Sequence, residues 1–241
     1  MLTTLISWGA IKIYTYGACL AVGIFLSLYA WWKMGRDEHL DEISLFDGYF
    51  LALVIYLISA RASYVLWHWS ELGTLYRSLA ILAYPGFYGA VGILVSSLFL
   101  YLFSRARDWD GWRVADMFVV SLGMALIFGG LGSVFNGTSS IWYVNVWNLV
   151  WATITYGVVA RVRKNFRFYA WYKGEASVAP DGLASLIFGG LVGVYYLGLG
   201  LMTKYWLAGL GFMFIVLAMA IIQSRIGKKW NLIQWLRTRR S

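Results

Sequence analysis

Long apolar stretches, separated by short polar segments, follow one another along almost the whole chain. Each stretch is long enough to cross about 30 Å of hydrocarbon, because a helix rises about 1.5 Å per residue. Only a helix satisfies every backbone polar group of such a segment inside a bilayer. The pattern therefore predicts an all-α integral membrane protein with seven transmembrane helices in a single polytopic domain, residues 1–241. The predicted spans are residues 11–32, 45–68, 78–103, 114–135, 141–160, 182–203 and 205–224.

The composition agrees with a membrane protein. Of the 241 residues 61% are hydrophobic and only 13% are charged, whereas soluble domains carry about 25% charged residues. The single cysteine, Cys19, excludes a disulfide framework. The two histidines, His39 and His68, are too far apart in the sequence to indicate a metal site. No cofactor is expected.

Lysine and arginine fall almost entirely on one side of the predicted membrane. Of the 20 basic residues, sixteen follow the first, third, fifth and seventh spans, three lie on the opposite side, and the last is Arg61. The positive-inside rule then predicts an N-terminus outside and a C-terminus in the cytoplasm. The net charge of +9 is explained by this topology and by anionic lipid head groups, so nucleic acid is not an expected partner.

Arg61 is the only Lys, Arg, Asp or Glu well inside a predicted span. A charge at the centre of a bilayer costs about 2.5–3.5 kcal/mol on insertion scales, so an intramembrane arginine is a functional-site hypothesis by default. The topology places Arg61 roughly 10 Å below the outer surface, given about 1.5 Å of helix per residue.

Further polar and aromatic residues map to the same outer third of the predicted bundle. An interfacial aromatic belt explains surface tyrosines, but it does not explain the arginine or the asparagines. A hydrophilic cavity open to the outer leaflet explains both, and it contains one titratable candidate, His68, and no carboxylate. The residues assigned to this cavity with Arg61 are Tyr16, His68, Tyr88, Ser133, Asn136, Asn145, Asn148 and Tyr196.

Several segments, taken in order, resemble the prolipoprotein diacylglyceryl transferases of bacterial inner membranes. The signature of that family is approximately G-R-x-G-N-F-x-N-G-E, and residues 129–138, Gly-Gly-Leu-Gly-Ser-Val-Phe-Asn-Gly-Thr, align with it. Tyr16-Gly17, the segment Ser59–Leu66 with Arg61, and Gly86–Ala90 are similar to three further segments of the family. The predicted seven spans with an outside N-terminus also match the family's topology.

The resemblance implies an activity, its partners and its residues. Members of the family move a diacylglyceryl group from phosphatidylglycerol to the thiol of a lipobox cysteine in a prolipoprotein signal peptide, at the outer leaflet of the inner membrane. Arg61 and Asn136 match the role of holding the phosphate, and Tyr16 that of a polar lining residue, so these three are the catalytic candidates. The residues expected to bind substrate are Tyr88, Ser133, Asn145, Asn148, Tyr196 and His68.

Several charged residues of the family are replaced, which leaves alternatives open. The first hypothesis is a divergent transferase in which His68 or a tyrosine replaces the missing base. The second is a catalytically silent relative that binds phospholipid or a lipoprotein precursor. A seven-helix transporter or receptor is less well supported, because the spans hold no buried carboxylate and the last one holds no lysine. The replacing residues are Gly130, Ser133, Thr138, Asn145, Asn148, Tyr196 and Gly200.

Overall fold

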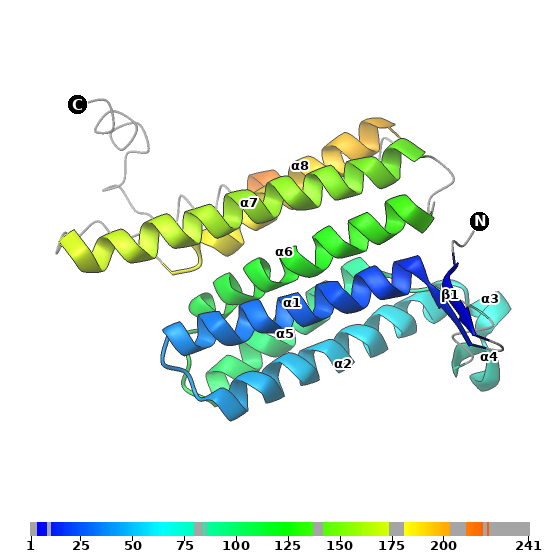
Figure 1. Ribbon diagram of the computed structural model, residues 1–241, viewed down its shortest axis with the longest axis horizontal. Helices are drawn as coiled ribbons and strands as arrows, with labels where there is room; N and C mark the ends of the chain where they lie inside the picture. The colour runs from blue at the N-terminus through cyan, green and yellow to red at the C-terminus, as the bar shows by residue number, and fades with distance from the viewer. Residues whose placement is uncertain are drawn as a thin grey trace. The chain divides into compact units, whose positions relative to one another are not determined.

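The computed structural model describes residues 4–8, 11–79, 84, 86–136, 142–173, 181–202, 211–218 and 221. These residues are almost entirely helical (Figure 1). The elements, in chain order, are β1 Thr4–Trp8, β2 Ile11–Tyr14, α1 Thr15–Asp37, α2 Glu42–Trp67, α3 Trp69–Leu72, α4 Leu75–Leu79, α5 Gly89–Ala106, α6 Gly111–Asn136, α7 Trp142–Lys173 and α8 Leu183–Met202.

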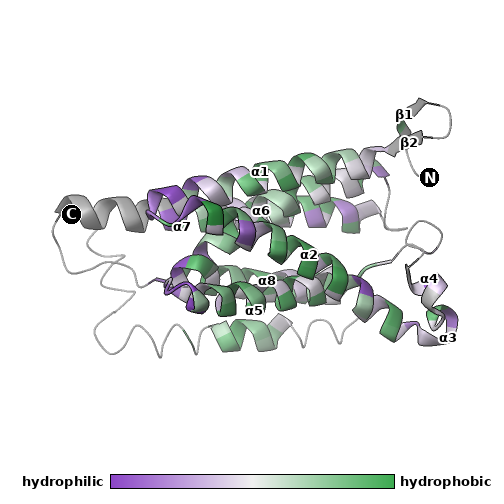
Figure 2. Cartoon of the chain, turned by 90° about the horizontal axis from the view of Figure 1, so that it is seen from below, coloured by the Kyte–Doolittle hydropathy of each residue, from purple (hydrophilic) through white to green (hydrophobic). Residues whose placement is uncertain are grey.

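Among the described residues, five helices are long and apolar enough to cross a membrane, namely α1, α2, α5, α6 and α8. Figure 2 shows hydrophobic residues along most of α2, α5 and α8. The prediction of a helical, multi-pass membrane protein is confirmed at this level, whereas seven crossings and their direction stay predictions. Helix α7 is less apolar, because Asn145 and Asn148 interrupt its start and basic residues its end. Of the predicted span 205–224, only residues 211–218 and 221 are described, and they are helical.

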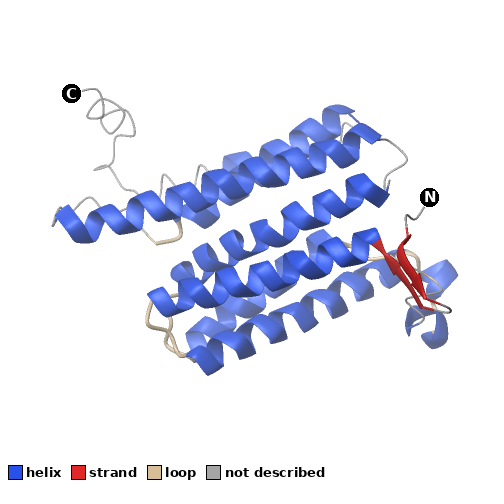
Figure 3. Cartoon of the chain, in the orientation of Figure 1, coloured by secondary structure: helices blue, strands red, loops and turns tan. Residues whose placement is uncertain are grey.

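A two-stranded antiparallel hairpin precedes α1 and departs from the all-α prediction (Figure 3). Its register runs from Thr4 opposite Tyr14 to Trp8 opposite Ile11. The first helix therefore begins at Thr15 rather than at residue 11. The local sequence Ile-Lys-Ile-Tyr explains the difference, because β-branched and aromatic residues favour a strand over a helix.

The chain forms two compact units. One consists of Leu28–Phe118, and the other of Met1–Ser27 together with Val119–Ser241. The boundaries fall inside α1 and inside α6, so each of these helices contributes residues to both units.

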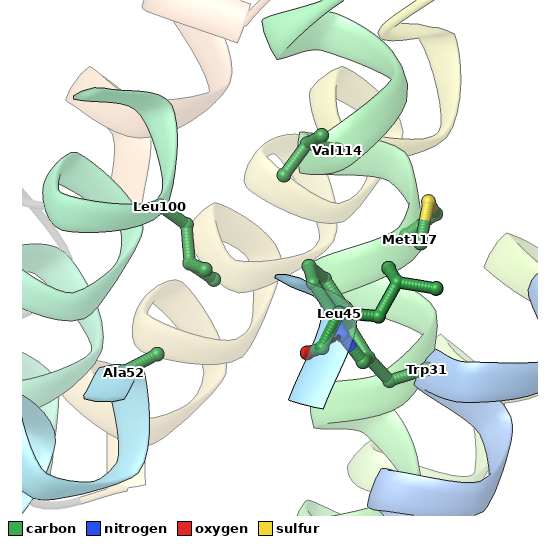
Figure 4. Close-up of a cluster of buried hydrophobic side chains, with 6 residues drawn as sticks. All are labelled: Trp31, Leu45, Ala52, Leu100, Val114 and Met117. Atoms are coloured by element: carbon green, nitrogen blue, oxygen red, sulfur yellow. Dashed lines mark hydrogen bonds between the residues drawn. The ribbon is translucent and has the colours of Figure 1, made fainter. Parts of the chain in front are cut away.

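A buried apolar cluster forms the core of the unit Leu28–Phe118. Trp31 of α1 and Leu45 of α2 are almost completely buried, and the indole N–H of Trp31 donates a hydrogen bond to the backbone oxygen of Leu45 at 2.9 Å. This bond satisfies the polar atom of a tryptophan that is otherwise surrounded by apolar groups. The cluster comprises Trp31, Leu45, Ala52, Leu100, Val114 and Met117 (Figure 4).

Helices α2 and α5 approach closely because glycines of one helix face aromatic rings of the other. A Cβ atom at Gly92 of α5 would lie 2.7 Å from the ring of Tyr56 in α2. Small residues at such positions let helix backbones come together in a membrane. Just before α5, the backbone N–H of Tyr88 donates to the backbone oxygen of Ala60 at 3.0 Å. The start of α5 is thereby held against the C-terminal half of α2.

Two interhelical turns of this unit are built alike. After α1, His39 has a φ of 58°, and after α5, Asp108 has a φ of 56°. An apolar residue follows in each case, Leu40 or Trp109, and its N–H donates to the carbonyl five residues earlier, at 3.0 Å and 2.8 Å respectively. This is the Schellman ending, in which a left-handed residue reverses the chain and satisfies a terminal carbonyl.

An aspartate caps the next helix in both turns. The carboxylate of Asp41 accepts the N–H of Ser44 at 2.9 Å, and that of Asp110 accepts the N–H of Trp112 at 2.8 Å. The pKa of the Asp41 carboxyl lies below its ordinary value, because Ser44 hydrogen bonds to the charged form and Arg107 adds a favourable positive charge.

Replacing Asp41 with asparagine is expected to remove one source of acid sensitivity. The folded carboxyl has a pKa below the ordinary 3.8, so its contribution to stability is complete above the ordinary pKa and is lost as the pH falls through the folded pKa. Asparagine keeps a capping oxygen but does not titrate. The unfolding temperature, measured along an acid series, should fall less steeply in the variant. Equal slopes for the two proteins would contradict this account.

The other unit is held by close pairs of helices. A Cβ atom at Gly132 of α6 would lie 3.1 Å from the ring of Tyr16 in α1, and the hydroxyls of Ser27 and Ser121 are 2.8 Å apart. A Cβ atom at Gly198 of α8 would similarly meet a tryptophan ring of α7 at 2.5 Å. These contacts bring α1 against α6 and α7 against α8.

Candidate functional site

The guanidinium of Arg61 is buried and donates hydrogen bonds to four backbone carbonyls. Arg61 is 7% exposed. Its Nε donates to the oxygen of Ser78 at 2.9 Å, and its Nη2 to that of Arg77 at 3.2 Å. Its Nη1 donates to Tyr84 at 2.8 Å and to Gly86 at 3.0 Å. A guanidinium carries five N–H groups, so one of them is left by these contacts.

These bonds attach the last turn of α4, Tyr84 and Gly86 to α2. Arg77 and Ser78 lie in the last turn of α4, where backbone oxygens lack partners within the helix. Arg61 supplies those partners and also holds Tyr84 and Gly86. Among the described residues no carboxylate pairs with Arg61, so no neighbouring negative charge offsets its positive charge. The phosphate-holding role predicted for Arg61 stays a prediction.

Tyr64 lies between Arg61 and His68 on one face of α2. The Arg61 Cζ is 5.9 Å from the centre of the Tyr64 ring, and the His68 ring is stacked on Tyr64 with centroids 4.3 Å apart. The spacing i, i+3, i+7 places the three residues on the same helix face. Gly86 closes over this ring, because a Cβ atom at residue 86 would overlap Tyr64.

Tyr88 completes this group of side chains. Its ring is 5.3 Å from that of Tyr64 and 6.1 Å from that of His68, measured between centroids. The planes of Tyr88 and His68 are 28° apart. We call Arg61, Tyr64, His68, Gly86 and Tyr88 the α2 cluster.

The end of α6 carries two of the predicted polar residues. Ser133 is 8% exposed and Asn136 is 7% exposed. The Ser133 hydroxyl donates to the backbone oxygen of Gly130 at 2.7 Å, within its own helix. Tyr16 packs beside Gly132 of the same helix. Tyr16 therefore lies at the contact of α1 with the last turns of α6, the turns that also carry Ser133 and Asn136.

Asn148 of α7 and Tyr195 of α8 form a second polar contact in this unit. The hydroxyl of Tyr195 donates to the side-chain oxygen of Asn148 at 2.7 Å. Tyr196, the residue predicted to bind substrate, stacks on Phe214 instead, with centroids 6.5 Å apart and planes at 20°. Asn145 is 4% exposed. The sequence selected Asn148 and Tyr196 as site residues, whereas the hydrogen-bond partner of Asn148 is Tyr195.

The backbone of α7 fills the space beside Gly130, the residue that the sequence resemblance aligns with the signature arginine of the family. A Cβ atom at Gly130 would lie 2.9 Å from the Cα of Leu149 and 3.2 Å from its backbone nitrogen. Backbone atoms in the middle of a helix cannot move aside as a flexible side chain can. In this structure α6 and α7 leave no room for an arginine at residue 130.

The predicted residues divide between the two units. Arg61, His68 and Tyr88 meet in the unit Leu28–Phe118, whereas the others belong to the second unit. A single cavity containing both groups stays a prediction. The residues of the second group are Tyr16, Ser133, Asn136, Asn145, Asn148 and Tyr196.

Sequence reasoning missed Tyr64 and Gly86, the centre of the α2 cluster. The signal for Tyr64 was its helical spacing from Arg61 and His68, which places the three residues on one helix face. A tyrosine in a membrane span looks like any interfacial aromatic, however, and Gly86 like any turn residue. Among the residues that the structure describes, His, Cys, Asp and Glu form no cluster of three that could hold a metal ion.

Comparison with known families gives the relationship of the chain. The sequence model of one family, described as prolipoprotein diacylglyceryl transferase, matches residues 3–142, which is more than half of the 241 residues. The chain belongs to this family. The match confirms the resemblance drawn from the sequence motifs. The matched range contains the whole α2 cluster and Asn136, and it ends at Trp142, before Asn145 and Asn148.

Individual relatives in the prolipoprotein diacylglyceryl transferase family are distant. The phosphatidylglycerol–prolipoprotein diacylglyceryl transferase of Streptococcus suis (strain 05ZYH33) is 22% identical over 231 residues, covering 85% of this chain and 86% of the relative. That of Limosilactobacillus reuteri (strain DSM 20016) is 31% identical over 131 residues, covering 53% of this chain and 46% of the relative. That of Aliarcobacter butzleri (strain RM4018) is 27% identical over 145 residues, with 53% and 52% covered.

Proposed function

We propose that this protein transfers a diacylglyceryl group from phosphatidylglycerol to the cysteine thiol of a prolipoprotein. Family membership and the names of relatives that align over most of the chain support this reaction. The observation that carries the proposal is the α2 cluster. It places a retained positive charge, an imidazole and two phenols together at one end of a membrane-length helix, inside the range matched by the family.

The proposal includes a location and a topology. Seven spans in the bacterial inner membrane, with the N-terminus outside and the C-terminus in the cytoplasm, follow from the sixteen basic residues on one side and three on the other. In that orientation the C-terminal end of α2, with the α2 cluster, lies toward the outer leaflet. Phosphatidylglycerol and a membrane-inserted signal peptide both reach this level.

Each predicted residue has a role in this proposal. Arg61 attracts the lipid phosphate through its charge, because its carbonyl partners are neutral. Asn136 and Tyr16 supply hydrogen bonds to the head group and to the departing glycerol phosphate. The side chains proposed to line the path of the lipid and the peptide are Tyr88, Ser133, Asn145, Asn148, Tyr196 and His68.

The close approach of α6 and α7 supports a second candidate function. Gly130 stands where the family signature has an arginine, and the backbone of Leu149 occupies the space beside it. A protein that lost this charge and filled its site could still bind phospholipid without cleaving it. The second candidate is therefore a silent relative that binds phosphatidylglycerol or a lipoprotein precursor.

A transfer assay separates the two candidates. The purified protein in nanodiscs that contain phosphatidylglycerol is incubated with a lipobox peptide, and the thioether product is measured by mass spectrometry. Product formation supports the transferase. Bound phosphatidylglycerol without product supports the silent relative, and neither binding nor product would reject both.

A further inference from the structure

The side chain of His68 is held in one defined tautomer. Its Nδ1 lies 3.1 Å from the backbone oxygen of Tyr64. A carbonyl oxygen can only accept a hydrogen bond, so Nδ1 must carry the hydrogen and donate it. In the neutral ring the other nitrogen, Nε2, then has a free lone pair. Fixing one imidazole nitrogen through a carbonyl leaves the opposite nitrogen available for proton transfer or metal binding.

The ring is also fixed in position. It stacks on Tyr64 at 4.3 Å with planes 30° apart, and it faces Tyr88 at 6.1 Å with planes 28° apart. The other face of the α2 cluster is anchored by Arg61, whose four carbonyl bonds hold the segment that leads to Tyr88. His68 itself is half-buried. The structure therefore presents an oriented imidazole that is not fully enclosed.

We infer that Nε2 of His68 is the base that accepts the thiol proton of the attacking cysteine. This inference rests on the proposed transferase function and names the group that carries out its proton transfer. Histidine suits the role because its ordinary pKa lies close to physiological pH.

The step balances without a cofactor. The thiol S–H bond breaks and its proton moves to Nε2, which makes the imidazole cationic. The sulfur then forms a bond to the glyceryl carbon that carries the phosphate, and the bond between that carbon and the phosphate oxygen breaks. The electron pair leaves with glycerol phosphate, and the imidazolium later gives its proton to this product or to water. Arg61, one helical turn beyond Tyr64, carries a charge of the sign that attracts the departing phosphate.

Two aromatic rings and one cation surround this part of the α2 cluster. Tyr64 lies on the same helix as His68, and Tyr88 faces the ring from the segment before α5. The Arg61 guanidinium approaches the same Tyr64 ring, with its Cζ 5.9 Å from the ring centre.

The test uses two asparagine variants of the full-length protein in nanodiscs. His68→Asn retains an N–H donor close to the position of Nδ1 but lacks the base. It is expected to lower kcat at least about 100-fold, the usual contribution of a general base, while KM changes little. His39→Asn is the matched control, since asparagine tolerates the left-handed conformation at that position. It should retain the activity of the parent protein.

Two further measurements test the role of His68 independently of the asparagine variants. Added imidazole should partly restore the rate of His68→Ala, which a merely structural role of His68 would not permit. In the His39→Asn protein His68 is the single histidine, so its ring nitrogens can be assigned by nitrogen NMR, with Nε2 expected to be unprotonated in the neutral ring. A His68→Asn protein as active as the parent, or a neutral ring protonated at Nε2, would overturn the inference. A parent protein without transfer activity would instead reject the proposed function, and with it the reaction step.

Discussion

Replacing Arg61 with alanine is expected to lower the free energy of unfolding by about 3 kcal/mol, because the variant leaves four backbone carbonyls without their donors. The loss should be concentrated in the segment that Arg61 holds, so Tyr84, Gly86 and Tyr88 would separate from α2. Unfolding in detergent micelles, followed by heat and by denaturant, measures the change. Hydrogen exchange of residues 77–88 shows whether the loss is local.

Arg77→Ala is the matched control for this experiment. Arg77 is exposed and its side chain donates to one backbone oxygen, that of Glu71, at 3.1 Å. Arg77→Ala removes one positive charge, as Arg61→Ala does, but it leaves the contacts of the α2 cluster in place. Its effect on the free energy of unfolding should therefore be small. Arg61→Lys should fall between the two, since an ammonium keeps the charge but cannot reproduce the planar fork of a guanidinium. Equal stability of Arg61→Ala and Arg77→Ala would disprove the carbonyl contacts.

Unchanged phosphatidylglycerol binding by Arg61→Ala would disprove the phosphate-holding role.

Restoring the family's signature arginine at residue 130 is expected to damage the protein instead of activating it. Even a methyl group at Gly130 would lie 2.9 Å from the Cα of Leu149, so Gly130→Ala should destabilise by about 1–3 kcal/mol, as overpacking usually does. The Gly130→Arg protein should either unfold or have α6 separated from α7, and its rate of diacylglyceryl transfer should not rise. Unfolding temperatures and the transfer assay measure both effects.

Two glycines of the same unit serve as controls. A Cβ atom at Gly157 of α7 or at Gly189 of α8 would meet nothing within 4 Å. Alanine at either position should leave stability unchanged or raise it, by up to about 1 kcal/mol, because glycine is a poor helix former. A stable Gly130→Arg with faster transfer would show that α6 and α7 can separate and that the site accepts the missing charge.

The sequence predicted the membrane helices because their signal is local. The stretch 45–68 is apolar whatever surrounds it, and α2 runs over Glu42–Trp67. The start of α1 was misplaced because Ile11–Tyr14 pairs with a strand, and such pairing depends on a partner segment. The presence of a charge inside a membrane span could likewise be recognised at Arg61 from its position in the sequence.

The partners of Arg61 could not be predicted, and the reason is physical. They are backbone oxygens, which every residue carries, so no residue type marks Ser78 or Tyr84 as a partner. The sequence favoured polar side chains as neighbours of the guanidinium. The same limit applies to Asn148, whose partner Tyr195 differs from its neighbour Tyr196 only in the direction in which it points from α8.

The contacts of Arg61 also set an order of events while the chain is being made. Helix α2 emerges from the ribosome before any of its four carbonyl partners exists, and the most distant one, Gly86, lies 25 residues further along. At about 5–20 residues per second this interval lasts about 1–5 s. During that time α2 carries an unsatisfied arginine, whose insertion costs about 2.5–3.5 kcal/mol. The guanidinium of Arg61 can therefore form its full set of hydrogen bonds only after the chain has been made as far as Gly86.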